Sequence, residues 1–200
     1  MAFQYYAIYK PFGMLSQFSK EIPEHQTLAD LDFQFPKDVY PIGRLDKDSE
    51  GLLLLSNDRS INHNLLHPST AHTRSYWVQV EGKITPKALA QLQKGVSIKI
   101  NKKNYSTRPA KAKLLEQAPP VPVRIPPIRE RKNQPTSWIE LTLTEGKNRQ
   151  VRRMTATVGF PTLRLVRHQI VHLKMEQWEA GAVHPLAPKD FMQLLELNKV

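Results

Sequence analysis

A short acidic turn that leads into an apolar segment is the part of this sequence best suited to chemistry. The run Gly43–Leu55 contains Asp46, Asp48 and Glu50 and ends in four consecutive leucines. Four leucines are too few to cross a membrane, and such a run fits a strand that is buried on both faces. A buried strand is a rigid base, so it can hold the carboxylates that precede it in a fixed orientation. A carboxylate held in this way can act as a nucleophile or as a base.

The charge of the chain indicates a polyanionic partner. The 200 residues include 29 Lys and Arg against 18 Asp and Glu, a formal net charge of +11. No acidic residue lies between Glu81 and Glu116 or between Glu145 and Glu176, whereas lysines and arginines accumulate in both intervals. Two solvated basic faces would explain this pattern, but a nucleic-acid partner explains it better.

Length and composition narrow the setting further. Two hundred residues predict one domain, or one domain of two lobes. Cysteine is absent, which excludes disulfides and thiolate metal sites and is typical of a reducing compartment. The first residues contain no basic region followed by a long apolar stretch, and no segment is long enough to span a bilayer. We therefore expect a cytoplasmic protein that does not bind membranes.

The predicted elements are strands mixed with isolated helices. Period-two and apolar runs predict strands at Tyr5–Tyr9, Leu52–Leu55, Tyr76–Val80, Val96–Ile100, Ala110–Leu115, Ile139–Thr144 and Leu163–Arg167. Helices are expected near Thr27–Leu31, from Asn57 to His67, over Pro86–Lys94, and after a cap at Asn148 as far as Gly159. Because these elements show no regular βαβ alternation, they predict an α+β fold with a mainly antiparallel sheet.

The segment Pro119–Pro135 stands apart in composition. Its six prolines exclude a helix or an interior strand and predict a stiff extended loop. A plain linker is one interpretation. The other is RNA binding by Arg129, Arg131 and Lys132, because a stiff loop loses little entropy when it grips folded RNA.

Three blocks of sequence resemble the pseudouridine synthases of the RsuA/Rlu type. They are, in chain order, Gly43–Leu55, then Arg74–Gly82 with arginine in place of the usual lysine, and Glu145–Met154 followed by Leu163–Arg167. Their order and spacing agree with the family over nearly the whole chain. The resemblance implies the family's α+β catalytic fold, a mainly antiparallel mixed sheet in two lobes with flanking helices. It also implies a single catalytic domain over residues 1–200, with its motifs within about residues 3–168.

Members of this family commonly carry an N-terminal S4 RNA-binding domain. This chain has no room for one before Tyr5, and together with Pro126–Lys132 and Pro135–Trp138 this is typical of one branch of the family. The resemblance to that branch implies that a uridine of large-subunit (23S) ribosomal RNA, in the peptidyl-transferase region, is isomerised to pseudouridine. We expect the protein to act as a monomer on this RNA and to need no cofactor.

The resemblance also implies roles for four residues. The catalytic aspartate of the family falls on Asp46, and the tyrosine whose ring lies against the target base falls on Tyr76. Arg44 matches an arginine that occupies the space left by the flipped nucleotide. A desolvated carboxylate keeps its charge best when a cation lies beside it, and Arg152, whose counterpart pairs with the aspartate, is the candidate.

Other cations of the same blocks are predicted to contact RNA phosphates. They are Lys147, Arg149, Arg153, Arg164 and Arg167, in addition to the three in the proline-rich segment. Arg149 and Arg153 are four residues apart on the expected helix and should share its outward face.

Two metal-site interpretations fail on inspection. Asp46, Asp48, Glu50 and Gly51 imitate the first half of an EF-hand loop, but Asn57 stands where the bidentate glutamate is needed. His63 and His67 have zinc-site spacing, but Asn64 occupies the position of the glutamate of a zincin. We therefore expect no metal.

Two functions compete with the isomerase. A catalytically silent RNA-binding or ribosome assembly factor would keep the fold, although intact Asp46, Tyr76 and Arg152 argue against it. A hydrolytic glycosylase would share the carboxylate but release free uracil. The sequence also leaves open whether the aspartate acts as a nucleophile or as a base.

Overall fold

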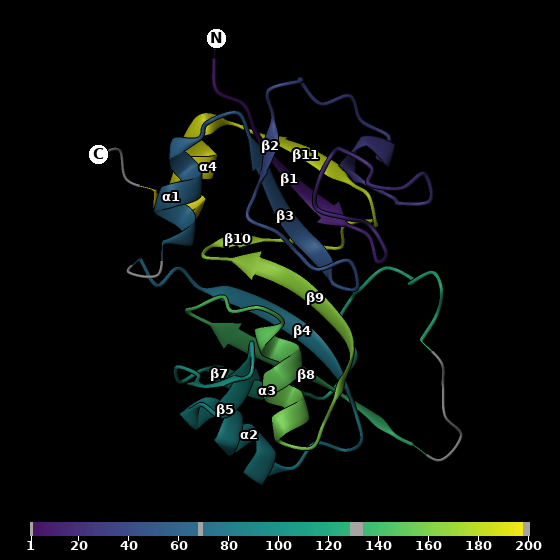
Figure 1. Cartoon of the computed structure of the whole chain (residues 1–200), viewed down its shortest axis with the longest axis vertical. Coiled ribbons are helices and arrows are strands. Elements are labelled where there is room, and N and C mark those ends of the chain that lie inside the picture. Colours follow the sequence, from purple (N-terminus) through teal and green to yellow (C-terminus); the bar gives the residue numbers. More distant parts are fainter. Residues whose placement is uncertain (1, 68–69, 129–133, 198–200) are drawn as a thin grey trace. The chain divides into compact units, whose positions relative to one another are not determined.

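The computed structural model of the chain describes residues 2–67, 70–128 and 134–197 (Figure 1). The chain forms two compact units. The first unit comprises Met1–His72 and Arg167–Val200, and the second comprises Thr73–Val166. The two ends of the sequence therefore belong to one unit, and the middle of the sequence forms the other.

The first unit is built on a sheet of short strands around β3. Its strands are β1 (Tyr5–Lys10), β2 (Tyr40–Ile42), β3 (Glu50–Ser56), β10 (Leu173–Lys174), β11 (Val183–Leu186) and the last residues of β9 (Thr162–Ile170). β1 pairs antiparallel with β11 and β3, β2 pairs antiparallel with β3, and β10 pairs antiparallel with β9. The register sets Lys10 opposite Gly51, which brings the end of β1 to the start of β3.

The predicted strand of leucines is confirmed, and it is buried on both faces. Leu52, Leu53, Leu54 and Leu55 are each 0% exposed. Because successive side chains of a strand point to opposite faces, Leu53 and Leu55 enter one apolar cluster while the other two leucines face away from it. The unit also contains the helices α1 (Ser60–Leu66) and α4 (Pro188–Leu194) and the 3-10 turn η1 (Leu28–Asp30).

The second unit combines a meander of strands with two helices. Its elements are β4 (Arg74–Glu81), α2 (Pro86–Lys94), β5 (Ser97–Ile100), β6 (Lys103–Ser106), β7 (Lys111–Leu115), β8 (Thr136–Leu143), α3 (Gln150–Thr157) and the first residues of β9. β8 pairs antiparallel with β4 and β7, and β5 and β6 form a separate hairpin. The predicted α+β class and the mainly antiparallel pairing are therefore confirmed.

One face of this sheet carries the core of the second unit. Val78 and Val80 of β4 lie in a buried cluster that also receives Val151 and Met154 of α3. Tyr76, two residues before Val78, packs against the same cluster but is only half-buried. One face of β4 and one side of α3 therefore pack together in this core.

Helix α2 begins and ends at the predicted residues. The Thr85 hydroxyl accepts a hydrogen bond from the Ala88 amide (3.2 Å), and Pro86 occupies the first helical position. The helix ends at Gly95, whose φ of +88° suits glycine. An added Cβ there would also lie 2.4 Å from the carbonyl oxygen of Thr107.

The prediction that Asn148 caps α3 is wrong. The residue before the helix is Arg149, which adopts a left-handed conformation (φ 50°) and makes no side-chain cap. The Asn148 side chain instead accepts a hydrogen bond from Arg153 Nη2 (3.1 Å). The start of the helix is instead linked to the preceding loop by Gln150, whose Oε1 accepts a hydrogen bond from the Lys147 amide (2.9 Å).

Other differences concern short elements. The helix expected near Thr27–Leu31 is only the 3-10 turn η1, and β2, β6, β10, β11 and α4 had no sequence prediction. Residues 119–128 lie outside helices and strands, as the prolines predict, whereas Arg129, Arg131 and Lys132 lie outside the described residues. Within the part of the chain that the structure describes, no helix is long and apolar enough to cross a membrane.

Candidate active site

The turn that carries Asp46 is fixed by the loop that follows β1. The Ser16 hydroxyl accepts a hydrogen bond from the Leu45 amide (3.0 Å) and lies 2.9 Å from the Leu45 carbonyl oxygen, to which it donates. The Gly13 amide donates to the Lys47 carbonyl oxygen (2.8 Å). Within the turn, the Ser49 amide donates to the Asp46 carbonyl oxygen (3.0 Å). The backbone on both sides of Asp46 is therefore held, while its side chain is half-buried.

Gly51 fixes the other end of the turn. Its φ is +101°, and an added Cβ would lie 2.3 Å from the carbonyl oxygen of Arg167 in β9. The close approach of the two strands thus requires glycine at this position. The acidic turn consequently enters β3 at one fixed place.

A buried lysine lies within the electrostatic reach of the acidic turn. Lys10 is 0% exposed, and its Nζ donates to the carbonyl oxygens of Pro11 (2.8 Å) and Met14 (2.7 Å). Burial lowers the pKa of Lys10 to about 8, although the nearby carboxylates of Glu50, Asp48 and Asp46 oppose this shift, in that order. The first unit therefore places a desolvated cation beside the acidic residues of the predicted active site.

The three acidic side chains have different surroundings. Glu50 is 3% exposed, and the Tyr9 hydroxyl donates to its Oε2 (3.3 Å). Asp46 and Asp48 are half-buried. Glu50 thus belongs to the frame of the site, whereas Asp46 and Asp48 can be reached from solvent.

A cavity opens beside the same turn. It has a volume of about 330 Å³ and is lined on one side by Gly43, Arg44, Leu45 and Lys47. The remaining lining residues, all of the first unit, are Leu15, Ser16, Gln17, Pro41, Asn62 and Leu66. Arg44 is exposed at this cavity, so its guanidinium is available to a bound nucleic acid.

Tyr76 and Arg152 lie in the second unit. Tyr76 is half-buried on β4, and Arg152 is half-buried on α3 between the buried residues Val151 and Met154. Asp46 and Arg44 belong to the first unit. The structure thus places Asp46 and Arg44 in one unit and Tyr76 and Arg152 in the other, and the pairing of Asp46 with Arg152 stays a prediction.

Glu145 organises the basic loop before α3. It is 7% exposed, and its carboxylate accepts hydrogen bonds from the Tyr105 hydroxyl (2.5 Å), the Arg108 amide (2.9 Å) and Gln150 Nε2 (2.6 Å). Burial alone would raise the pKa of Glu145, but these hydrogen bonds outweigh burial and lower it. Because Gln150 also holds the Lys147 amide, the hairpin of β5 and β6 is tied to the loop that leads into α3.

The predicted phosphate-binding cations have unequal exposure. Lys147 and Arg149 are exposed, and Lys147 Nζ lies 5.0 Å from the centroid of the Tyr105 ring. Arg153 donates to the carbonyl oxygens of Asn148 and Lys99. Arg164 and Arg167 are only 7% and 6% exposed.

The two buried arginines, Arg164 and Arg167, donate hydrogen bonds to backbone carbonyl groups. Arg164 donates to the Pro122 carbonyl oxygen (2.8 Å), and Arg167 donates to the Leu52 carbonyl oxygen (2.8 Å). Their contact with RNA phosphates stays a prediction, as does that of Arg153.

Sequence reasoning missed Lys10, Tyr9, Glu145 and Tyr105. One signal was present, because Lys10 lies between the predicted strand Tyr5–Tyr9 and a proline, so that a charged side chain follows an apolar run. Tyr105 gave no signal, since its partner Glu145 lies 40 residues away in the sequence.

Comparison with known proteins gives consistent results. A sequence profile for RNA pseudouridylate synthases matches residues 4–157. The chain is 48% identical over 177 residues to the ribosomal large subunit pseudouridine synthase E of Xanthomonas axonopodis pv. citri, which covers 88% of this chain and 87% of that protein. It is 34% identical over 193 residues to the ribosomal large subunit pseudouridine synthase B of Bacillus subtilis, with 96% and 72% covered.

The fold is shared with solved structures as well. A crystal structure of a pseudouridylate synthase superimposes with a TM-score of 0.78 at 24% identity, over 96% of this chain and 74% of that one. The structure of human RNA pseudouridylate synthase domain containing 1 gives a TM-score of 0.60 at 13% identity. The profile match spans both Asp46 and Tyr76 as well as Arg152, and the chain belongs to the RNA pseudouridylate synthase family.

Proposed function

We propose that this enzyme isomerises one uridine of large-subunit ribosomal RNA, in the peptidyl-transferase region, to pseudouridine. The observation that carries the proposal is the family match over residues 4–157, which includes the Asp46 turn fixed at the start of a fully buried strand. The relatives named for the large ribosomal subunit support this substrate. The net charge of +11 suits a polyanionic partner.

The reaction is redox-neutral and redistributes bonds within the substrate. The bond from ribose C1′ to uracil N1 breaks, the base rotates and C1′ bonds to C5. The hydrogen at C5 leaves as a proton, and N1 takes up a proton from solvent. In our proposal the Asp46 carboxylate acts at the ribose, either by attacking C1′ or by removing the proton at C2′. The hydrogen bonds that Ser16, Gly13 and Ser49 donate to backbone carbonyl groups of this turn would help to position the carboxylate during either route.

Three further side chains complete the proposed site. Arg152 would lie beside Asp46 and keep the carboxylate charged once RNA excludes water. Tyr76 would stack against the target base, an interaction worth roughly 1–3 kcal/mol. Arg44, exposed at the cavity beside the turn, would fill the space that the flipped nucleotide leaves.

The choice of target needs contacts beyond the reacting nucleotide. Uridines are abundant in RNA, and the site at Asp46 meets only one nucleoside. We propose that the Pro119–Pro135 segment, with Arg129, Arg131 and Lys132, contacts phosphates of the folded RNA around the target.

Release of a label from uracil C5 tests the proposal. Large-subunit ribosomal RNA carrying tritium at C5 is incubated with the purified protein, and the products are separated. Tritium in water indicates isomerisation and supports the proposal. Free labelled uracil would identify a hydrolytic glycosylase, and no release at all would identify a binding protein, so either result overturns it.

A further inference from the structure

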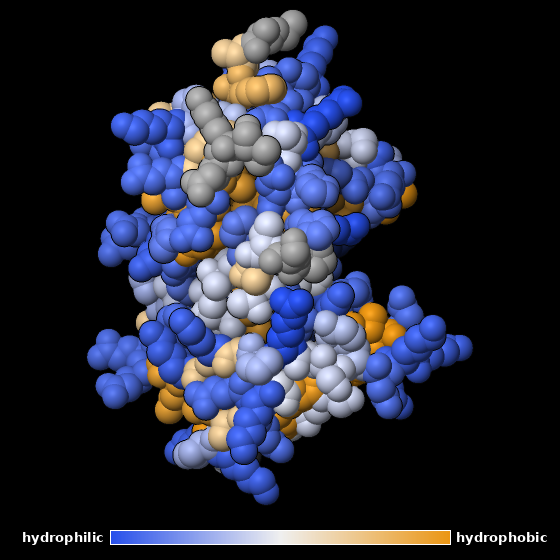
Figure 2. All heavy atoms as spheres, turned by 90° about the vertical axis from the view of Figure 1, so that its left-hand side faces the viewer, coloured by the Kyte–Doolittle hydropathy of each residue, from blue (hydrophilic) through white to orange (hydrophobic). Residues whose placement is uncertain are grey.

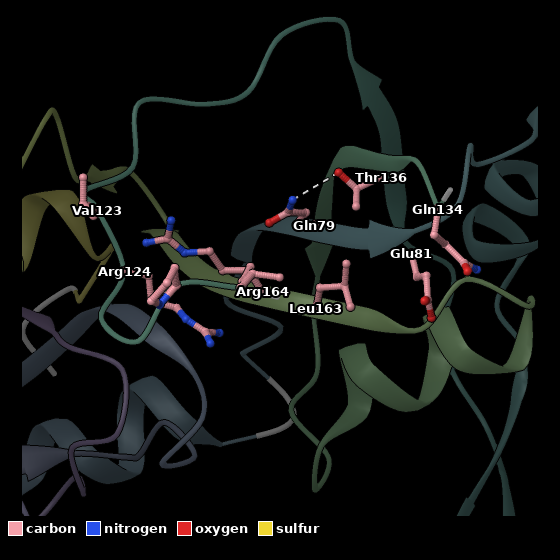
Figure 3. Close-up of a pocket in the computed structure, with 10 residues that line it drawn as sticks. Gln79, Glu81, Val123, Arg124, Gln134, Thr136, Leu163 and Arg164 are labelled. Carbon is pink, nitrogen blue, oxygen red and sulfur yellow. Dashed lines mark hydrogen bonds between the residues drawn. The ribbon is translucent and has the colours of Figure 1, made fainter. Parts of the chain in front are cut away.

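A pocket lies between the sheet of the second unit and the proline-rich segment (Figure 3). Its volume is about 420 Å³, within the range of sites that bind small molecules. One wall comes from β4, β8 and β9, with Gln79, Glu81, Thr136, Leu163 and Arg164. The other wall consists of Val123, Arg124, Pro127, Ile128 and Gln134. Asp46, Tyr76 and Arg152 do not line it.

Both ends of the segment are tied to the sheet. Arg164 Nη2 donates to the Pro122 carbonyl oxygen (2.8 Å), and the Gly82 amide donates to the Pro135 carbonyl oxygen (2.7 Å). Within the segment, Arg124 Nε donates to the Pro126 carbonyl oxygen (2.8 Å). The prolines among residues 119–128 restrict the backbone of this wall, which lowers the conformational entropy lost when a ligand binds.

The pocket combines apolar surface with amide groups. Gln79 and Glu81 alternate with the buried Val78 and Val80, so they project from the face of β4 opposite the core. The Gln79 amide donates to Thr136 Oγ1 (3.1 Å), which leaves its carbonyl oxygen on the other side of the amide (Figure 3). Glutamine amides can donate to and accept from the edge of a base. Exposed apolar side chains such as Val123, which is 87% exposed, can cover the face of a base.

Charge is distributed unevenly along the pocket. Arg124 and Arg164 lie toward one side in Figure 3, and Glu81 and Gln134 lie toward the other. A phosphate is favoured near the arginines and disfavoured near Glu81. A nucleotide therefore fits in one orientation, with its phosphate near Arg124 and its base toward the glutamines.

We propose that this pocket binds an unpaired nucleotide of the RNA substrate other than the target uridine. Single-stranded RNA is recognised in this way, by covering the faces of splayed-out bases and hydrogen bonding to their edges. The proposal rests on the proposed function, because it takes the RNA that the enzyme modifies as the ligand. It makes Gln79 and Gln134 specificity-determining residues, with Arg124 as a phosphate contact.

A cycle of RNA and protein changes tests the pocket. The probe is a synthetic fragment of large-subunit RNA centred on the uridine that the wild-type protein modifies, with each flanking nucleotide replaced in turn by an abasic residue. The protein carries Gln79→Ala with Gln134→Ala. The matched control carries Gln91→Ala with Gln117→Ala, two exposed glutamines of the same unit that do not line the pocket.

For the wild type and the control, one abasic position should weaken binding roughly tenfold. For the pocket variant, the same abasic position should change Kd by a clearly smaller factor, because the hydrogen bonds to the edge of the base are already lost. If the effects of the abasic substitution and of the pocket variant on the binding free energy add at every position, no base occupies the pocket and the proposal is overturned. If the wild-type protein modifies no uridine of the RNA, the proposed function fails instead, so the two failures are distinguishable.

Discussion

Asp46 and Glu50 lie four residues apart and yet have different surroundings. Glu50 is buried at the start of β3 and accepts a hydrogen bond from the Tyr9 hydroxyl, whereas Asp46 is half-buried at the turn. The nearby Lys10 is fully buried and satisfied by backbone carbonyl groups. The residues of the turn thus divide into a buried frame and a carboxylate that substrate can reach.

Replacing Asp46 with asparagine should abolish turnover. The amide is close to the carboxylate in size, but it is neither a nucleophile nor a base. RNA affinity and thermal stability should stay close to those of the wild type. The label-release assay measures turnover, a binding titration measures RNA affinity, and thermal unfolding measures stability. Asp48→Asn is the matched control and should be much milder. An active Asp46→Asn enzyme beside an inactive Asp48→Asn enzyme would show that the catalytic carboxylate is Asp48.

The lowered pKa of Lys10 should make the free energy of unfolding depend on pH. Burial lowers its pKa to about 8 from the ordinary 10.5, so between these values the unfolded chain binds more protons than the folded one. The wild type should therefore gain stability relative to Lys10→Met as the pH rises from 8 to 10.5, by on the order of 2–3 kcal/mol. Below pH 8 the full cost of burying the charge is present. Urea unfolding of both proteins across this range measures the difference, and a constant difference would refute the shift.

At the scale of the elements, the junction of β3 and β9 depends on Gly51. Gly51→Ala should destabilise the protein by about 3 kcal/mol or more, because the residue has a φ of +101° and its Cβ would collide with the Arg167 backbone. Gly146→Ala is the control, since an added Cβ there meets nothing within 4 Å. Denaturant unfolding compares the two variants. Equal stabilities would mean that the strands separate without cost at this point.

The link between the β5–β6 hairpin and the loop before α3 depends on Tyr105. Tyr105→Phe should cost about 1–2 kcal/mol, because the Glu145 carboxylate loses one of its three donors. The pKa of Glu145 is lowered in the folded protein, so the cost should be complete above about 4.5 and shrink as the pH falls further. Tyr40→Phe, at a tyrosine that is 52% exposed, is the control. If Tyr105→Phe lowers the free energy of unfolding no more than the control does, this hydrogen bond does not stabilise the protein.

Local sequence signals predict an element when capping residues or a run of apolar residues mark it. Thr85, Pro86 and Gly95 mark both ends of α2, and the leucines of β3 mark a strand buried on two faces. Asn148 misled because its side chain binds Arg153, while Gln150 ties the start of α3. β11 contains a proline and only four residues, and its pairing with β1 is a long-range contact that no local pattern reveals.

The site was predictable where a motif is contiguous. The turn around Asp46 could be identified from a single run of sequence, whereas the roles of Tyr76 and Arg152 are implied by the resemblance of their sequence blocks to the family and stay predictions. The partners that hold the turn, Ser16 and Gly13, come from a different segment and depend on tertiary structure. The burial of Arg164 and Arg167 also depends on tertiary structure, because both arginines donate hydrogen bonds to backbone carbonyl groups of distant segments.

At the scale of the whole molecule, the basic surplus is only partly available to RNA. The net charge is +11, yet Lys10, Arg164 and Arg167 are buried and satisfy backbone carbonyl groups. Hydrophilic side chains nevertheless cover most of the face shown in Figure 2. We therefore expect RNA binding to depend on exposed cations such as Arg44, Lys147 and Arg149.

A map of the pseudouridines in ribosomal RNA shows whether this protein is the enzyme that we propose. Pseudouridines are mapped in large-subunit RNA from cells that lack this protein and from the same cells supplied with wild type or Asp46→Asn. Our account predicts the loss of one pseudouridine in the peptidyl-transferase region, its return with the wild type, and its absence with Asp46→Asn. A map that is unchanged when the protein is missing, or a site restored by Asp46→Asn, would contradict the account.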